Sequence, residues 1–171
     1  MRLIAEKLGK TDKYDRLRFL RSDGSECATS MPRQGTLPHD LLHYVVETAL
    51  PLKHGFLSLV AAGQDARFVM ELAHDAANAQ ISTEAVQAEA IVEALQTQLW
   101  GGYFDLDDFL HGASLASAGR GKAAFDFSSL NPQSLLYDRA MALLEHWNQL
   151  SYHQSLELVF VAGCPAGSDG P

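Results

Sequence analysis

A segment near the start of the chain places three candidate metal ligands at a regular spacing. His39, His43 and Glu47 follow one another at four-residue intervals within Thr36–Leu50. On an α-helix, residues at this spacing lie above one another along one face. Two imidazoles and a carboxylate on one face form a ligand set for Zn²⁺ or another divalent transition metal. The segment therefore predicts a metal site, with Asp40 beside it as a supporting residue or a candidate catalytic base.

Candidates for a fourth ligand lie later in the chain. Glu71 and His74 have the Glu-x-x-His spacing, which is half of a di-iron carboxylate site. The sequence has no second copy of this motif, so a full di-iron site is not expected. Glu89 and Glu93 lie one turn apart on a predicted helix and are further candidates, although carboxylates on helices are usually solvated.

A reading without metal fits the same residues. On a helical wheel, His39, His43 and Glu47 lie at the edge of the apolar face, where a pocket rim would be and where an amphipathic helix also turns polar. The alternative is a non-catalytic protein-interaction or oligomerisation module in which this helix is structural. If the protein is catalytic, two histidines and one carboxylate would leave coordination positions for water, as hydrolytic or lyase chemistry requires.

Two resemblances attach to this segment. The string LPHDLLHYVVE, from Leu37 to Glu47, resembles one in small bacterial proteins of unknown function. Within it, His39-Asp40-x-x-His43 resembles the HDxxH zinc motif of a ubiquinone-biosynthesis family, which implies zinc binding and a further glutamate later in the chain than Glu47. The order His-Asp differs from the HExxH helix of zincins, whose glutamate is the general base. The shorter Asp40 would reach a metal-bound water less readily.

Charge is distributed unevenly along the chain, whose net charge is −8. Residues 1–36 hold eight basic residues against five acidic ones, whereas the remainder holds five basic and sixteen acidic residues. An acidic body disfavours nucleic-acid binding, which requires neutralisation of phosphates. The basic N-terminal hairpin could instead meet an acidic protein partner or a second copy of the chain, unless its arginines form an ordinary solvated face.

Compartment and membrane association are also predicted from composition. The opening residues MRLIAEKLGK lack the apolar segment of a secretory signal, and no apolar run is long enough to span a bilayer. Cys27 and Cys164 lie near opposite ends of the chain and indicate neither a disulfide framework nor a zinc ribbon. We therefore expect a cytoplasmic protein with no membrane partner.

The two ends of the chain read as β-structure. Strands are predicted at residues 2–7, Tyr14–Arg21, Glu26–Met31 and Ser155–Val161, with a hairpin turn at Asp23-Gly24. Alternation places Leu17 and Phe19 of the hairpin on one face, together with Leu156, Leu158 and Phe160 of the last strand. We expect the last strand to pair back with the N-terminal hairpin in one antiparallel sheet, with this face under the helices.

The middle of the chain reads as helical. The predicted helices are residues 38–50, a short buried helix from Gly55 to Val60, residues 65–77, Thr83–Trp100, Asp105–Ser114 followed by a loop to Gly121, and residues 131–150. The fold prediction is therefore a single α+β domain over residues 1–161, a small antiparallel sheet covered by a helical layer. Residues 162–171 are expected to form a flexible C-terminal tail.

Overall fold

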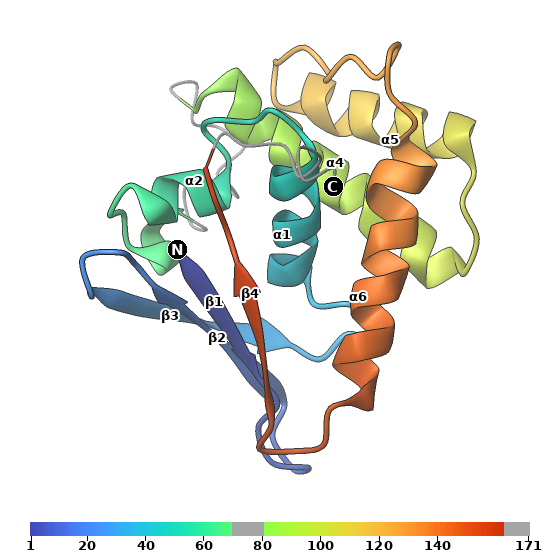
Figure 1. The fold of residues 1–171 in the computed structure, drawn as a ribbon. Helices are drawn as coiled ribbons and strands as arrows, with labels where there is room; N and C mark the ends of the chain where they lie inside the picture. The colour runs from blue at the N-terminus through green and yellow to red at the C-terminus, as the bar shows by residue number, and fades with distance from the viewer. Residues whose placement is uncertain (70–80, 163–171) are drawn as a thin grey trace, which may run out of the picture.

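The fold is an antiparallel sheet with helices against one face (Figure 1). The computed structural model describes residues 1–69 and 81–162. The strands are β1 (Arg2–Glu6), β2 (Tyr14–Leu20), β3 (Glu26–Pro32) and β4 (Ser155–Val159). Their order is β3-β2-β1-β4, and every neighbouring pair is antiparallel. This confirms the predicted α+β class and the return of the last strand to the sheet.

Alternation fixes which side of the sheet faces the core. Leu17 and Phe19 of β2 are fully buried, as predicted, and Phe160 just after β4 is also buried. Leu156 and Leu158 are half-buried because β4 is an edge strand. β4 pairs with β1 and not directly with the hairpin, so the two ends of the described chain are held together.

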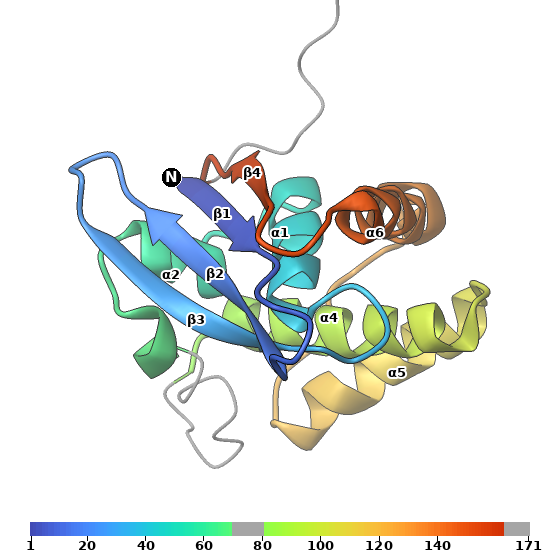
Figure 2. The same cartoon turned by 90° about the horizontal axis from the view of Figure 1, so that it is seen from below.

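The helices are α1 (His39–Ala49), α2 (Phe56–Ala61), α4 (Thr83–Gly101), α5 (Leu106–Gly119), the π-helical turn η1 (Gln133–Tyr137) and α6 (Asp138–Gln149). Helix α1 lies between the sheet and α4, because it contacts Thr29 of β3 on one side and Glu89 of α4 on the other. Helix α2 packs on the same face of the sheet. There the rings of Phe19 and Phe56 meet edge to face, with their centroids 5.8 Å apart. Figure 2 shows these two helices on one side of the strands.

Two predicted helices differ from those observed. Helix α5 runs to Gly119, through the stretch predicted as a loop, because Ala113 and Ser117 are one turn apart and both buried. The helix predicted at 131–150 opens with the π-helical turn before α6. Within the described residues, no helix is long and apolar enough to cross a membrane.

Several predicted features lie outside the described residues. These are Glu71 and His74, most of the predicted helix at 65–77, Cys164, and the predicted tail apart from Ala162.

Candidate metal centre

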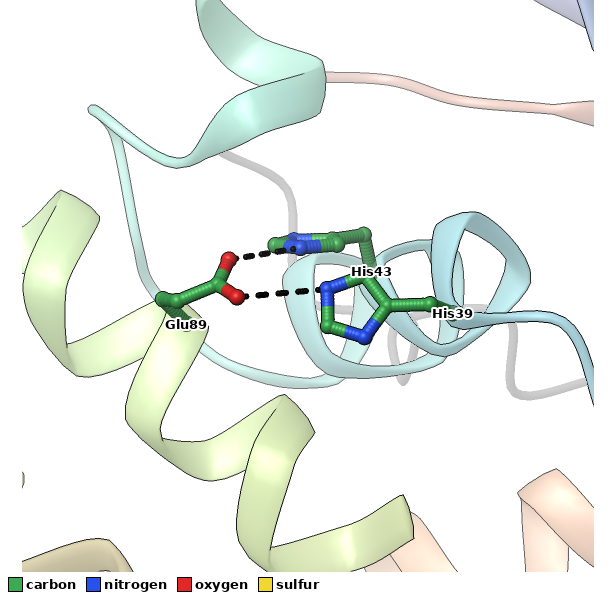
Figure 3. A group of neighbouring side chains, drawn as sticks. All are labelled: His39, His43 and Glu89. Atoms are coloured by element: carbon green, nitrogen blue, oxygen red, sulfur yellow. Dashed lines mark hydrogen bonds and ion pairs between the residues drawn. The ribbon is translucent and has the colours of Figure 1, made fainter. Parts of the chain in front are cut away.

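Three side chains from two helices converge on one point. His39 is the first residue of α1, His43 lies one turn later, and Glu89 faces both from α4 (Figure 3). His39 Nε2 lies 3.2 Å from Glu89 Oε1, and His43 Nε2 lies 3.1 Å from Glu89 Oε2. Ligand atoms of the three residues all lie within 4.8 Å of one another, and no other such group occurs in the part of the chain that the structure describes.

The ring of His43 is held from its other nitrogen by Glu47. His43 Nδ1 lies 3.1 Å from Glu47 Oε1. The Glu47 carboxylate also accepts hydrogen bonds from the backbone N–H groups of Leu57 and Ser58. Because Glu47 acts as an acceptor, Nδ1 of His43 carries a proton and donates to it. The nitrogen that faces Glu89 is therefore Nε2.

The ring of His39 is also held at Nδ1 by an acceptor, and it also turns Nε2 toward Glu89. Gln96 Nε2 donates a hydrogen bond of 2.6 Å to Gln34 Oε1, which turns the Gln96 carbonyl oxygen toward His39. That oxygen lies 3.4 Å from His39 Nδ1 and can only accept. Both histidines thus have an acceptor at Nδ1 and present Nε2 to the same carboxylate. The Nε2 lone pair of each histidine would face the negative Glu89 carboxylate unless a cation lies between them. Either a proton or a metal ion can be that cation.

Burial makes the charges in this cluster interact strongly. The side chains of His43, Glu47 and Glu89 are at most 5% exposed, whereas that of His39 is 17% exposed. Burial alone would lower the pKa of His43, but the hydrogen bonds to Glu47 and Glu89 outweigh it and raise this pKa from 6.5 to about 10. Burial would raise the pKa of Glu89, but hydrogen bonds to the two histidines hold it well below its usual 4.5.

The edge of the apolar face of α1, where this stripe is predicted to lie, is buried in the structure. His43 and Glu47 are 4% and 2% exposed, and they lie inside the protein. The wheel places them correctly relative to the other residues of α1, but α1 is covered by α4 and α2 as well as by the sheet. A helix covered on several sides buries its polar stripe too, and buried polar groups then need partners.

The structure brings together only part of the predicted ligand set. His39 and His43 converge as expected, but Glu47 lies at the Nδ1 edge of the His43 ring, away from the nitrogen that faces Glu89. Glu89, named only as a further candidate, completes the group. Glu93 forms an ion pair of 2.7 Å with Arg120 of the α5 C-cap.

Asp40, the candidate base, points toward the sheet. Its Oδ2 accepts a hydrogen bond of 2.6 Å from Thr29 Oγ1 of β3, and the residue is 2% exposed. Burial raises the pKa of the Asp40 carboxyl, and the hydrogen bond from Thr29 offsets only part of this effect. Asp40 is thus a buried link between α1 and β3.

Sequence reasoning gave Glu89 too little weight and missed Gln96, Gln34 and Gly55. A usable signal for Glu89 was its setting, since it stands as the single charge in the run Ala88–Val92, which is buried throughout. A helix that is apolar on all sides around one carboxylate indicates a buried charge, and buried charges are paired or bind metals. No comparable local signal marks the two glutamines.

The separations in the cluster suit a metal ion. In a tetrahedral zinc site with bonds of 2.0–2.1 Å, neighbouring ligand atoms lie about 3.3 Å apart. The Nε2-to-oxygen distances of 3.1 and 3.2 Å are close to this value, although they go to different oxygens of Glu89 and are also those of hydrogen-bonded ion pairs. The donor set of two neutral imidazoles and one carboxylate is also that of catalytic zinc and of non-haem iron(II) sites. No family model, curated protein or solved structure matches this chain, so the assignment depends on the geometry of the site.

Proposed function

We propose that the protein binds a divalent transition metal, with zinc as the first candidate, through His39 Nε2, His43 Nε2 and the Glu89 carboxylate. One observation carries the proposal: both histidines are held at Nδ1 by an acceptor and present Nε2 to one buried carboxylate. Acceptors at the far nitrogen are the usual companions of metal-bound histidines, because they fix the tautomer and orient the ring. The HDxxH resemblance supports zinc as the metal.

Three protein donors meet at the site within the part of the chain that the structure describes, and they leave at least one coordination position for water or another small ligand. This is the arrangement of catalytic zinc centres, whereas structural zinc sites have four protein ligands. His39 is the most exposed of the three, at 17%, so a small ligand would have to reach the open position from its side. We therefore propose a centre that can polarise a bound water, as hydrolytic and lyase reactions require.

The interaction-module alternative receives less support. Two arginines of the basic hairpin pair with carboxylates of the same chain, Arg16 with Glu6 and Arg18 with Glu26 at 3.1 Å, and Arg21 donates to the backbone carbonyls of Val60 and Gln64. Charges neutralised in this way offer little to an acidic partner. A cytoplasmic location remains part of the proposal, since Cys27 is a free thiol and a reducing compartment would keep it so.

Metal content of the untagged protein tests the proposal. Purified protein is stripped with a chelator and titrated with Zn²⁺, Co²⁺, Mn²⁺ and Fe²⁺ by calorimetry under anaerobic conditions. We expect one metal per chain for the wild type and none for His39→Ala, because that change removes a ligand from the more exposed edge of the cluster.

His54→Ala is the matched control for this experiment. His54 also pairs with a glutamate, Glu84, at 2.7 Å, but this pair is at the surface and outside the cluster. The control should bind metal like the wild type. A wild-type protein that takes up none of the four metals, or a His39→Ala variant that binds as tightly as the wild type, would overturn the proposal.

A further inference from the structure

The Glu47 side chain occupies the start of α2. Its Oε1 accepts the N–H of Leu57 at 3.1 Å, and its Oε2 accepts the N–H groups of Leu57 at 3.0 Å and Ser58 at 3.2 Å. The side chain is fully buried. One carboxylate therefore satisfies backbone donors of the first turn of α2 while it also holds Nδ1 of His43.

Gly55 makes room for this carboxylate. A Cβ atom added to Gly55 would overlap the carboxylate of Glu47. The backbone of Gly55 has φ −72° and ψ 175°, which any residue can adopt, so the conformation does not require glycine. Space is what requires it. Because the overlapping atoms are buried and hydrogen-bonded to backbone, they cannot move aside easily.

We infer that Glu47 is a positioning residue of the metal centre and that Gly55 is the residue that allows Glu47 to take up its position. The inference rests on the proposed metal-binding function. The backbone N–H groups of α2 keep Glu47 an acceptor, and Glu47 in turn keeps the proton of His43 on Nδ1. The lone pair of Nε2 is then available to the metal. The segment from Gly55 to Ser58 thus acts on His43 through Glu47, in addition to the direct contact of the Phe56 ring, whose centroid lies 5.2 Å from that of His43.

Glu47→Gln tests the first half of the inference, because it conserves volume. The amide oxygen of a glutamine would accept the backbone N–H groups, and its NH₂ group would then face His43 Nδ1. A neutral His43 would carry its proton on Nε2, the nitrogen that must bind the metal. We expect the zinc dissociation constant to rise by about 10–100-fold, the usual effect of losing a supporting partner.

Gly55→Ala tests the second half. The added methyl group should displace the Glu47 carboxylate. We therefore expect the zinc dissociation constant to rise, as it does for Glu47→Gln. Gly119→Ala is its matched control, since a Cβ at Gly119 near the end of α5 meets no atom within 4 Å. Gly119→Ala should bind zinc like the wild type. Glu47→Gln carries the test if Gly55→Ala does not fold.

The ring nitrogens of His43 provide a readout that stability alone would not change. In ¹⁵N-labelled, zinc-loaded wild type, we expect Nδ1 to carry the proton and Nε2 to show the shift of a metal-bound nitrogen. Wild-type zinc affinity in both Glu47→Gln and Gly55→Ala, or zinc on Nδ1 in the wild type, would overturn the inference and leave the metal site standing. A wild type that binds no zinc would refute the metal site itself, and this inference with it.

Discussion

In the metal-free protein, the positive charge on His43 determines how much stability is lost when a residue of this cluster is substituted. In the metal-free protein His43 lies between the carboxylates of Glu47 and Glu89 and donates to both. Removing one partner of a buried ion pair leaves an uncompensated buried charge. We expect His43→Ala to lower the free energy of unfolding by about 3–5 kcal/mol, the usual effect of breaking a buried pair.

His39→Ala should have a smaller effect, because His39 is partly exposed and Glu89 keeps His43 as a partner. Urea denaturation of both variants with a chelator present measures the difference. Equal stability of the two variants would show that His43 is uncharged in the metal-free protein.

Thr29 permits a separate test of Asp40. Thr29→Val conserves shape but removes the hydrogen bond from Thr29 to the Asp40 side chain, the only one this side chain makes among the described residues. Leaving a buried polar group without its partner costs about 1–3 kcal/mol of stability. Zinc affinity should not change, because Asp40 bonds to β3 and not to the ligand nitrogens. A loss of zinc affinity in this variant would instead give Asp40 a role at the metal.

At the scale of elements, α4, the helix that carries Glu89, packs against α5 as well as against α1. Gly112 of α5 lies where an added Cβ would sit 3.5 Å from the Cβ of Ala94 in α4, an ordinary van der Waals contact. Gly112→Ala should therefore stabilise the protein by about 0.4–1 kcal/mol, because alanine loses less backbone entropy on folding. Thermal unfolding measures the change. A lower midpoint would show that the two helices approach each other more closely than this contact allows.

Local patterns account for the elements, and long-range packing accounts for the site. Period two in β2 correctly predicts that Leu17 and Phe19 are buried, and the four-residue interval correctly predicts that His39 and His43 share a helix face. Both patterns express geometry within one element. Glu89 is 46 residues from His43, and only the packing of α4 against α1 brings it there. The position of Glu47 likewise depends on the start of α2, which no spacing within α1 could reveal.

For the whole molecule, the cluster makes stability depend on pH. The pKa of His43 is raised from 6.5 to about 10 on folding, so its contribution is fully present below about pH 6.5 and is lost as pH rises toward 10. The pKa of Glu89 is lowered on folding. The stability that Glu89 contributes is therefore present above pH 4.5 and is lost as the pH falls below it. The metal-free protein should lose stability as pH rises from 6.5 to 10, as chemical denaturation at a series of pH values would show. The pKa of Asp40 is also raised, so Asp40 too contributes a loss of stability as pH rises. The same measurement on Asp40→Asn leaves the loss that is due to His43.

Zinc should reverse this dependence on pH. A metal ion at Nε2 takes the place of the proton that His43 holds in the metal-free protein, so zinc binding releases that proton. Between about pH 6.5 and 8.5, zinc affinity should rise about tenfold per pH unit for each proton released, because a one-unit change of pH alters the competing proton concentration tenfold. The stabilisation by excess zinc should grow with pH over the same range in which the metal-free protein weakens. Calorimetry in two buffers of different ionisation enthalpy counts the protons. Zinc binding without proton release at pH 7.5 would mean that the metal binds elsewhere or that His43 is already neutral.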